Sequence, residues 1–227
     1  MEERLSLLYL PGCGSLPGGR KERFLEAYAA SCNCRLHCVE YAKPLGSEDY
    51  DRPAEALGNL HEALADARSA LSALGPPALV VAASMGAWIA AGLARGGGVR
   101  GALLVAPAGA RTASKAIAGK LPGTAVLPSE HSSSGGYAVH ASILRELEVS
   151  IAEMMPPDCP VCILHGDRDE AVPIETSEEL VQQLGERGVK ASLRSIPGGD
   201  HRLSKPAELE IMKEELDKLM ARKKMKK

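Results

Sequence analysis

The sequence has few aromatic residues, almost no net charge and no long apolar run. Only 3% of its 227 residues are aromatic, so a site that stacks planar ligands is not expected. The formal net charge of −2 gives no reason to expect a nucleic-acid partner. No apolar stretch approaches the roughly 20 residues that span a bilayer, which argues against stable membrane insertion.

The acidic start at residues 1–4 is unlike a secretory signal or a transit peptide. We therefore expect a cytoplasmic protein, or a mitochondrial or plastid one if a presequence has been removed.

Charge is unevenly distributed along the chain. Residues 221–227 carry five positive charges, whereas the rest of the chain carries an excess of acidic residues. A solvated end is the simplest interpretation of this basic tail, and contact with an anionic surface is the alternative.

The six cysteines do not form a recognisable metal site or disulfide framework. Cys32, Cys34 and Cys38 share one parity, so a strand through this segment would place their thiols on one face. Cys159 and Cys162 form a C-x-x-C, but they lie in an apolar run and lack a second pair at zinc-site spacing. We expect structural thiols, with no metal and no cofactor.

Apolar runs alternate with helical periodicity through most of the chain. This alternation predicts an α/β fold with a mostly parallel, doubly wound, six-stranded sheet in a single domain, residues 1–227. The expected strands cover residues 5–10, 35–41, 78–83, 101–106, 160–165 and 190–196. The expected helices cover residues 19–31, 53–74, 85–95, 177–187 and 206–224.

One segment interrupts this rhythm. Residues 107–157 separate two expected strands by far more than a plain crossover needs. The segment contains a polar serine- and glycine-rich run and an expected helix over residues 137–154. We interpret it as a helical cap over the carboxyl ends of the strands. Its apolar residues could hold an acyl chain or simply bury the cap on the body: Ala113, Ile117, Leu121, Val126, Leu127, Ile143 and Leu147.

The most informative motif is Ala82-Ala83-Ser84-Met85-Gly86, at an expected strand-to-helix junction. A serine in such an elbow adopts a strained backbone conformation that exposes its hydroxyl above the sheet. Small residues two positions before and after it are needed because strand and helix approach closely. Ala82 stands where the common pattern G-x-S-x-G has glycine, and it keeps that steric requirement.

Acidic residues and a histidine follow the next expected strands. Asp167 and Asp169 come after the fifth strand, and His201 comes after the sixth. A serine of ordinary acidity needs a base within hydrogen-bond reach, and the base needs an acid that orients it. All three groups fall at carboxyl ends of strands, where open α/β sheets place their ligands. His165, just before the acidic loop, is expected to pack or to bond the loop.

These motifs together resemble the α/β-hydrolase superfamily over nearly the whole chain, in a minimal form that lacks the first two strands. Within it, the chain resembles the mitochondrial palmitoyl-protein thioesterases that also act as acyl-glucuronide esterases. The residues that carry this likeness are Pro11-Gly12, the A-S-M-G-A-W elbow through Trp88, Gly136-Tyr137, the run C-P-V-C-I-L-H-G-D-R-D-E-A-V-P and the run D-H-R-L-S.

The resemblance assigns roles by position. It makes Ser84 the nucleophile, His201 the general base and Asp169 the acid, with Asp167 as the competing acid. Asp200 is expected to be a turn residue. The backbone N–H groups of Cys13 and Met85 would form the oxyanion hole. Apart from the resemblance, Tyr137 could line the substrate pocket or pack within the cap.

The function implied is a serine hydrolase that cleaves an ester or thioester through an acyl-enzyme. Alternatives are a small-molecule carboxylesterase, a dienelactone-type hydrolase, an acyltransferase, and a non-catalytic binding protein of the same fold. The substrate would be a small or acylated molecule. The sequence carries no information on oligomeric state.

Overall fold

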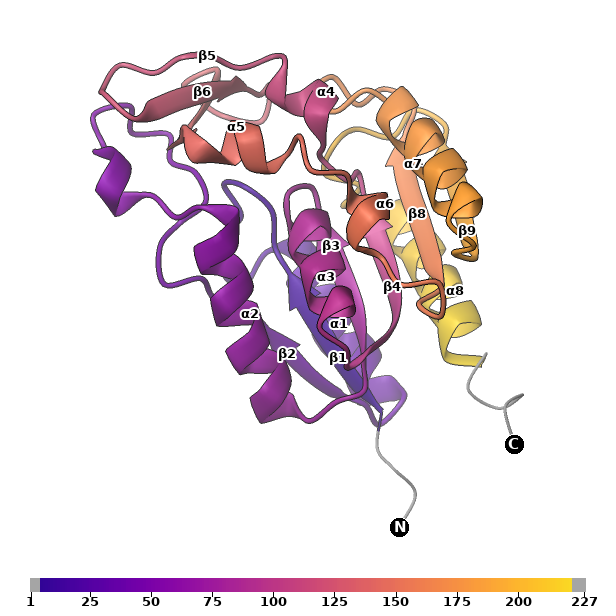
Figure 1. The fold of residues 1–227 in the computed structure, drawn as a ribbon. Helices are drawn as coiled ribbons and strands as arrows, with labels where there is room; N and C mark the ends of the chain where they lie inside the picture. Colours follow the sequence, from indigo (N-terminus) through magenta and orange to yellow (C-terminus); the bar gives the residue numbers. More distant parts are fainter. Residues whose placement is uncertain (1–4, 222–227) are drawn as a thin grey trace.

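The computed structural model describes residues 5–221 and contains a six-stranded, fully parallel sheet (Figure 1). The strand order is β2-β1-β3-β4-β8-β9, so the sheet winds outward in both directions from β1 and β3. The fold class expected from the sequence is confirmed. The strands are β1 (Ser6–Leu10), β2 (Arg35–Cys38), β3 (Ala78–Ala83), β4 (Val99–Val105), β8 (Val161–Gly166) and β9 (Ala191–Ile196).

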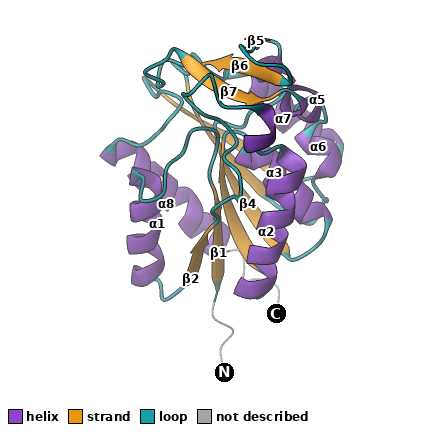
Figure 2. Cartoon of the chain, turned by 90° about the vertical axis from the view of Figure 1, so that its left-hand side faces the viewer, coloured by secondary structure: helices purple, strands orange, loops and turns teal. Residues whose placement is uncertain are grey.

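Helices cover both faces of this sheet (Figure 2). Helices α1 (Arg20–Ser31) and α8 (Pro206–Ala221) pack on one face. The other face is covered by α2 (Leu60–Leu74), α3 (Gly86–Arg95), α6 (Ile151–Met154) and α7 (Glu175–Glu186). Strand β3 is buried throughout because successive side chains enter opposite cores, Val80 into one and Val81 into the other.

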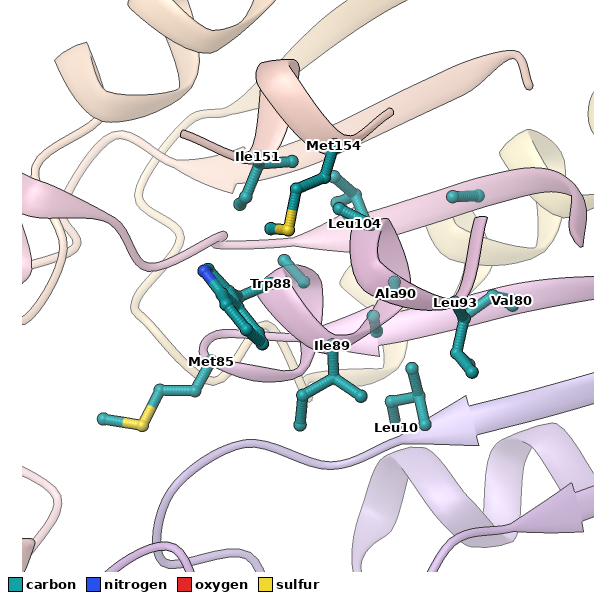
Figure 3. Close-up of a cluster of buried hydrophobic side chains, with 14 of the residues drawn as sticks. Leu10, Val80, Met85, Trp88, Ile89, Ala90, Leu93, Leu104, Ile151 and Met154 are labelled. Carbon is teal, nitrogen blue, oxygen red and sulfur yellow. The ribbon is translucent and has the colours of Figure 1, made fainter. Parts of the chain in front are cut away.

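Helix α3 lies in the middle of the larger core. All ten of its residues except Arg95 are buried. Figure 3 shows Met85 and Trp88 at its beginning within a cluster that includes Leu10 of β1 and Met154 of α6. Trp88 belongs to this core, since its side chain is 3% exposed. This burial anchors the helix that follows the serine elbow.

Most of the inserted segment 107–157 lies above the carboxyl ends of the strands, and only its last helix, α6, packs beside α3 on the body (Figure 1). It contains a three-stranded antiparallel sheet in the order β5-β6-β7 together with short helices. The elements are α4 (Ala110–Ala113), β5 (Ile117–Ala118), β6 (Thr124–Pro128), β7 (Gly136–His140), α5 (Ser142–Glu146) and α6.

The expected cap helix over residues 137–154 is wrong: the segment contains strand β7 followed by two separate short helices, α5 and α6. Tyr137 and Val139 lie on β7, where Tyr137 pairs with Leu127 of β6 and Val139 is fully buried. Tyrosine and valine both favour strands, and this pairing outweighs the helical periodicity of the segment. The cap is therefore mixed in secondary structure.

Two further expectations need correction. The helix expected over 53–74 begins only at Leu60, because Asn59 caps it in a capping box with Glu62 after a short 3-10 helix, η1 (Ala54–Ala56). Cys32 ends helix α1 and is exposed, so it does not share a strand with Cys38.

Some sequence-based expectations concern parts beyond the described chain. The closing helix is described to Ala221, and residues 222–227, which carry the basic tail, lie outside the described residues. Within residues 5–221, no helix is long and apolar enough to cross a membrane. No group of three or more His, Cys, Asp or Glu side chains in that range could hold a metal ion.

Candidate active site

Ser84 occupies the sharp turn between β3 and α3 and has a φ of 51°. A non-glycine residue in this left-handed region is strained, and strain of this kind concentrates at functional sites. The backbone on both sides holds it: Ser84 N–H donates to Val105 O at 2.8 Å, and Ala87 N–H donates to Ser84 O at 3.1 Å. Gly86 must be glycine, since a Cβ there would lie 2.5 Å from Leu10 O. The elbow expected from the sequence is present.

The loop after β1 runs directly against this elbow. A Cβ on Gly12 would lie 2.8 Å from the Cβ of Ser84 and 2.9 Å from Ala83 O, so only glycine permits this approach. The approach brings Cys13, which follows Gly12, to the side of the elbow. In the part of the chain that the structure describes, neither Cys13 N–H nor Met85 N–H donates to a backbone or side-chain acceptor.

His201 and Asp169 meet above the carboxyl ends of β9 and β8. His201 Nδ1 lies 2.7 Å from Asp169 Oδ2, and the side chain of Asp169 is fully buried. The other carboxylate oxygen, Oδ1, accepts the backbone N–H groups of Ala171 at 3.0 Å and Val172 at 2.8 Å.

The two other aspartates near this site, Asp167 and Asp200, accept hydrogen bonds from loop backbone. Asp167 Oδ1 accepts Gly198 N–H at 2.7 Å, and its side chain is exposed. Asp200 Oδ1 accepts the N–H groups of Arg202 at 2.9 Å and Leu203 at 3.1 Å, which is the turn role expected for it. The structure therefore brings Asp169 to the histidine, and it leaves Asp167 and Asp200 in loop contacts.

The ionised form of Asp169 is favoured in the folded protein. Burial opposes ionisation, but hydrogen bonds from His165, His201 and the Val172 N–H outweigh it and hold the pKa of Asp169 well below its usual range. A carboxyl group with a lowered folded-state pKa stabilises the fold above its unfolded value of about 4 and loses this effect as the pH falls.

This shift predicts an acid-dependent loss of stability. Wild type and Asp169→Asn should differ most in free energy of unfolding at neutral pH, and the difference should shrink at about pH 3, below the unfolded pKa. Urea denaturation of both proteins at the two pH values measures it. A difference that does not change with pH would contradict the assignment of this charge to the folded state.

A cavity of about 860 Å³ lies between the serine elbow and the loop that carries His201. Ser84, His201 and Tyr137 all line it. The apolar cap residues singled out above do not line the cavity. Leu127, Ile143 and Leu147 belong to the larger core, so they bury the cap on the body, and Val126 is buried as well.

Several cavity residues escaped the sequence analysis. Lys21, at the start of α1, donates from Nζ to Ser204 Oγ at 3.3 Å and to the carbonyl oxygen of Arg202. Burial, together with repulsion from Arg202, lowers the pKa of Lys21 to about 8. His131 of the cap also lines the cavity, and its carbonyl oxygen accepts Arg202 Nη2 at 3.0 Å. No motif marks these residues, because they come together only through the loops.

Comparisons with known proteins agree with this architecture. Residues 132–223 match the prolyl oligopeptidase family (Peptidase_S9), a segment that includes Asp169 and His201 but not Ser84. The chain is 27% identical to palmitoyl-protein thioesterase ABHD10, mitochondrial, of Pongo abelii over 94% of this chain and 72% of that protein.

Solved structures show the same fold. Mouse alpha/beta hydrolase domain-containing protein 10 superposes with a TM-score of 0.70 at 21% identity, covering 96% of this chain and 90% of that one. Est1E from Butyrivibrio proteoclasticus superposes with a TM-score of 0.70 at 16% identity, covering 98% and 89%. The expected resemblance to the α/β hydrolases, and to the mitochondrial thioesterase among them, is confirmed.

Proposed function

We propose that this chain, which has the α/β-hydrolase fold, is a serine hydrolase that cleaves an acyl thioester or carboxylic ester through an acyl-enzyme. The observation that carries the proposal is the 2.7 Å hydrogen bond between His201 Nδ1 and Asp169 Oδ2, in a pair whose histidine lines the same cavity as a strained serine. A buried carboxylate that orients an imidazole beside an elbow serine is the arrangement nucleophilic acyl transfer needs.

Each group has a defined step in this chemistry. The hydroxyl of Ser84 attacks the acyl carbon while His201 Nε2 takes its proton, and the same imidazole returns the proton to the leaving thiol or alcohol. A water molecule, deprotonated by His201, then releases the acid. Asp169 holds the Nδ1–H tautomer and stabilises the imidazolium. The N–H groups of Cys13 and Met85 would stabilise the oxyanion.

An acyl thioester is the substrate class we favour. The name palmitoyl-protein thioesterase, carried by the relative that covers most of this chain, supports it. Apolar side chains of Val39, Tyr41 and Leu45 line one part of the cavity, which has room for an acyl chain. Of the locations expected from the sequence, the same name supports the mitochondrial one. Tyr137 would contact the bound substrate from the cap.

Labelling with a fluorophosphonate probe tests the activated serine, and a substrate series tests the acyl group. Purified protein should react with the probe and should hydrolyse acyl-CoA thioesters faster than p-nitrophenyl esters of the same chain length. Faster cleavage of short p-nitrophenyl esters would favour the carboxylesterase alternative. Folded wild-type protein that the probe does not label would favour a non-catalytic binding protein. Acyl transfer to an added alcohol in place of water would indicate the acyltransferase.

The oxyanion hole makes a separate prediction at Gly12. Gly12→Ala should lower kcat about 100- to 1,000-fold, because the added Cβ would displace the loop that presents Cys13 N–H. Steady-state kinetics and circular dichroism of the variant measure activity and folding together. A folded variant with wild-type kcat would remove Cys13 N–H from the proposed hole.

A further inference from the structure

His165 is a fully buried histidine that the proposed chemistry leaves without a role. It lies next to the end of β8, four residues before Asp169, and its ring contacts three groups. Its Nε2 lies 2.9 Å from Val172 O and 3.2 Å from Asp169 Oδ2. Its Nδ1 lies 2.6 Å from the Oγ of Ser177 on helix α7. The ring thus joins β8, the acidic loop and α7 at one point.

The partners of His165 determine its tautomer. A carbonyl oxygen and a carboxylate oxygen can only accept, so Nε2 must carry the proton that faces Val172 O and Asp169 Oδ2. Nδ1 is then the acceptor, and the Ser177 hydroxyl donates to it. Ser177 is itself fully buried, so this donor has no water to turn toward. By donating to Nδ1, the hydroxyl holds the tautomer that His165 presents to the carboxylate.

The carboxylate of Asp169 consequently meets four donors. Oδ1 accepts two backbone N–H groups from the acidic loop, and Oδ2 lies between the two imidazoles of His165 and His201. A carboxylate held only at Oδ1 can still rotate about its Cβ–Cγ bond. The His165 N–H removes that freedom and holds Oδ2 toward His201 Nδ1.

We propose that His165, with its tautomer held by the Ser177 hydroxyl, is a positioning residue for the acid–base pair: its Nε2–H orients the Asp169 carboxylate so that Oδ2 accepts the Nδ1–H of His201. The inference rests on the proposed function for its kinetic consequence. The geometry itself concerns only the His–Asp hydrogen bond, which can be observed without turnover.

The kinetic test compares variants that remove or keep the donor. His165→Leu should lower kcat about 10- to 100-fold with little change in KM, the range typical for partners that orient functional side chains. His165→Gln, whose amide can return an N–H toward Oδ2, should recover part of the loss. Ser177→Ala, a smaller change, should give an intermediate kcat. Thr176→Val is the matched control and should keep wild-type kcat, because the neighbouring Thr176 hydroxyl is buried without a hydrogen-bond partner.

A spectroscopic test separates this inference from the proposed function. The low-field ¹H resonance of the His201 Nδ1 proton should be present in wild type, absent in Asp169→Asn, shifted in His165→Leu and in Ser177→Ala, and unmoved in Thr176→Val. Thermal unfolding identifies any variant that fails to fold, and Ser177→Ala then carries the comparison. If wild type proves inactive while the resonance still shifts, the proposed function fails and the positioning stands. Wild-type kcat and an unmoved resonance in folded His165→Leu would overturn the positioning.

Discussion

Replacing Ser84 by alanine should reduce hydrolysis by about 10⁴- to 10⁶-fold and abolish labelling by a fluorophosphonate. The loss is large because no other hydroxyl occupies the elbow between β3 and α3, and the acyl-enzyme cannot form without it. Alanine keeps the Cβ and meets the same φ of 51°, so the variant adds no new backbone strain. Labelling and kinetics of the purified variant, beside wild type, measure the effect.

Ser15→Ala is the matched control for this experiment. Ser15 also lines the cavity but is exposed in the loop after β1, so its removal should leave labelling in place. Loss of labelling in Ser15→Ala alone, with Ser84→Ala still labelled, would place the nucleophile in the loop after β1 and contradict the assignment to Ser84. Loss in neither variant would show that the probe reacts elsewhere.

Asp169→Asn should lower kcat by about 10⁴-fold, the effect expected when the base is left in the wrong tautomer. The surroundings of Asp169 explain why. The N–H groups of Ala171 and Val172 both point at Oδ1, so the amide oxygen of asparagine must take that position. The amide NH₂ then faces His201 Nδ1, which must become an acceptor. His201 Nε2 would carry the proton and could not take one from Ser84.

The neighbouring aspartate provides the control. Asp167→Asn keeps an oxygen acceptor for Gly198 N–H of the loop after β9 and should change kcat little, because this side chain is exposed and does not contact His201. Steady-state kinetics of both variants, with thermal unfolding to confirm folding, compare the two acids directly. A large loss in Asp167→Asn with near-normal activity in Asp169→Asn would reverse the assignment.

The order of strands and helices in the main sheet could be predicted from sequence because each element has its own local signal. The wholly apolar run at residues 78–83 indicates a strand buried on both sides, and β3 is such a strand. The periodicity of residues 60–74 predicts an amphipathic helix, and its buried residues follow that spacing. The elbow motif could be recognised because only small residues fit where the strand and the helix approach each other closely.

Local signals failed in the cap. The periodicity of residues 137–154 favours a helix, yet Tyr137 and Val139 pair with β6 and cover the body. Strand pairing depends on a partner more than a turn away in the chain, and no periodicity within one segment reports it. The apolar cap residues could equally have lined a pocket, and only packing showed that Leu127, Ile143 and Leu147 bury the cap.

The sequence by itself determined which chemistry-bearing residues lie at the carboxyl ends of which strands, since strand positions and chain order are local properties. Tertiary structure decided which of two aspartates, Asp167 or Asp169, meets His201, since both follow the same strand with the same parity. It also decided that His165 bonds the acid and that Lys21 enters the cavity. Hydrogen-bond partners of this kind come from separate loops, and their meeting depends on how those loops fold back over the sheet.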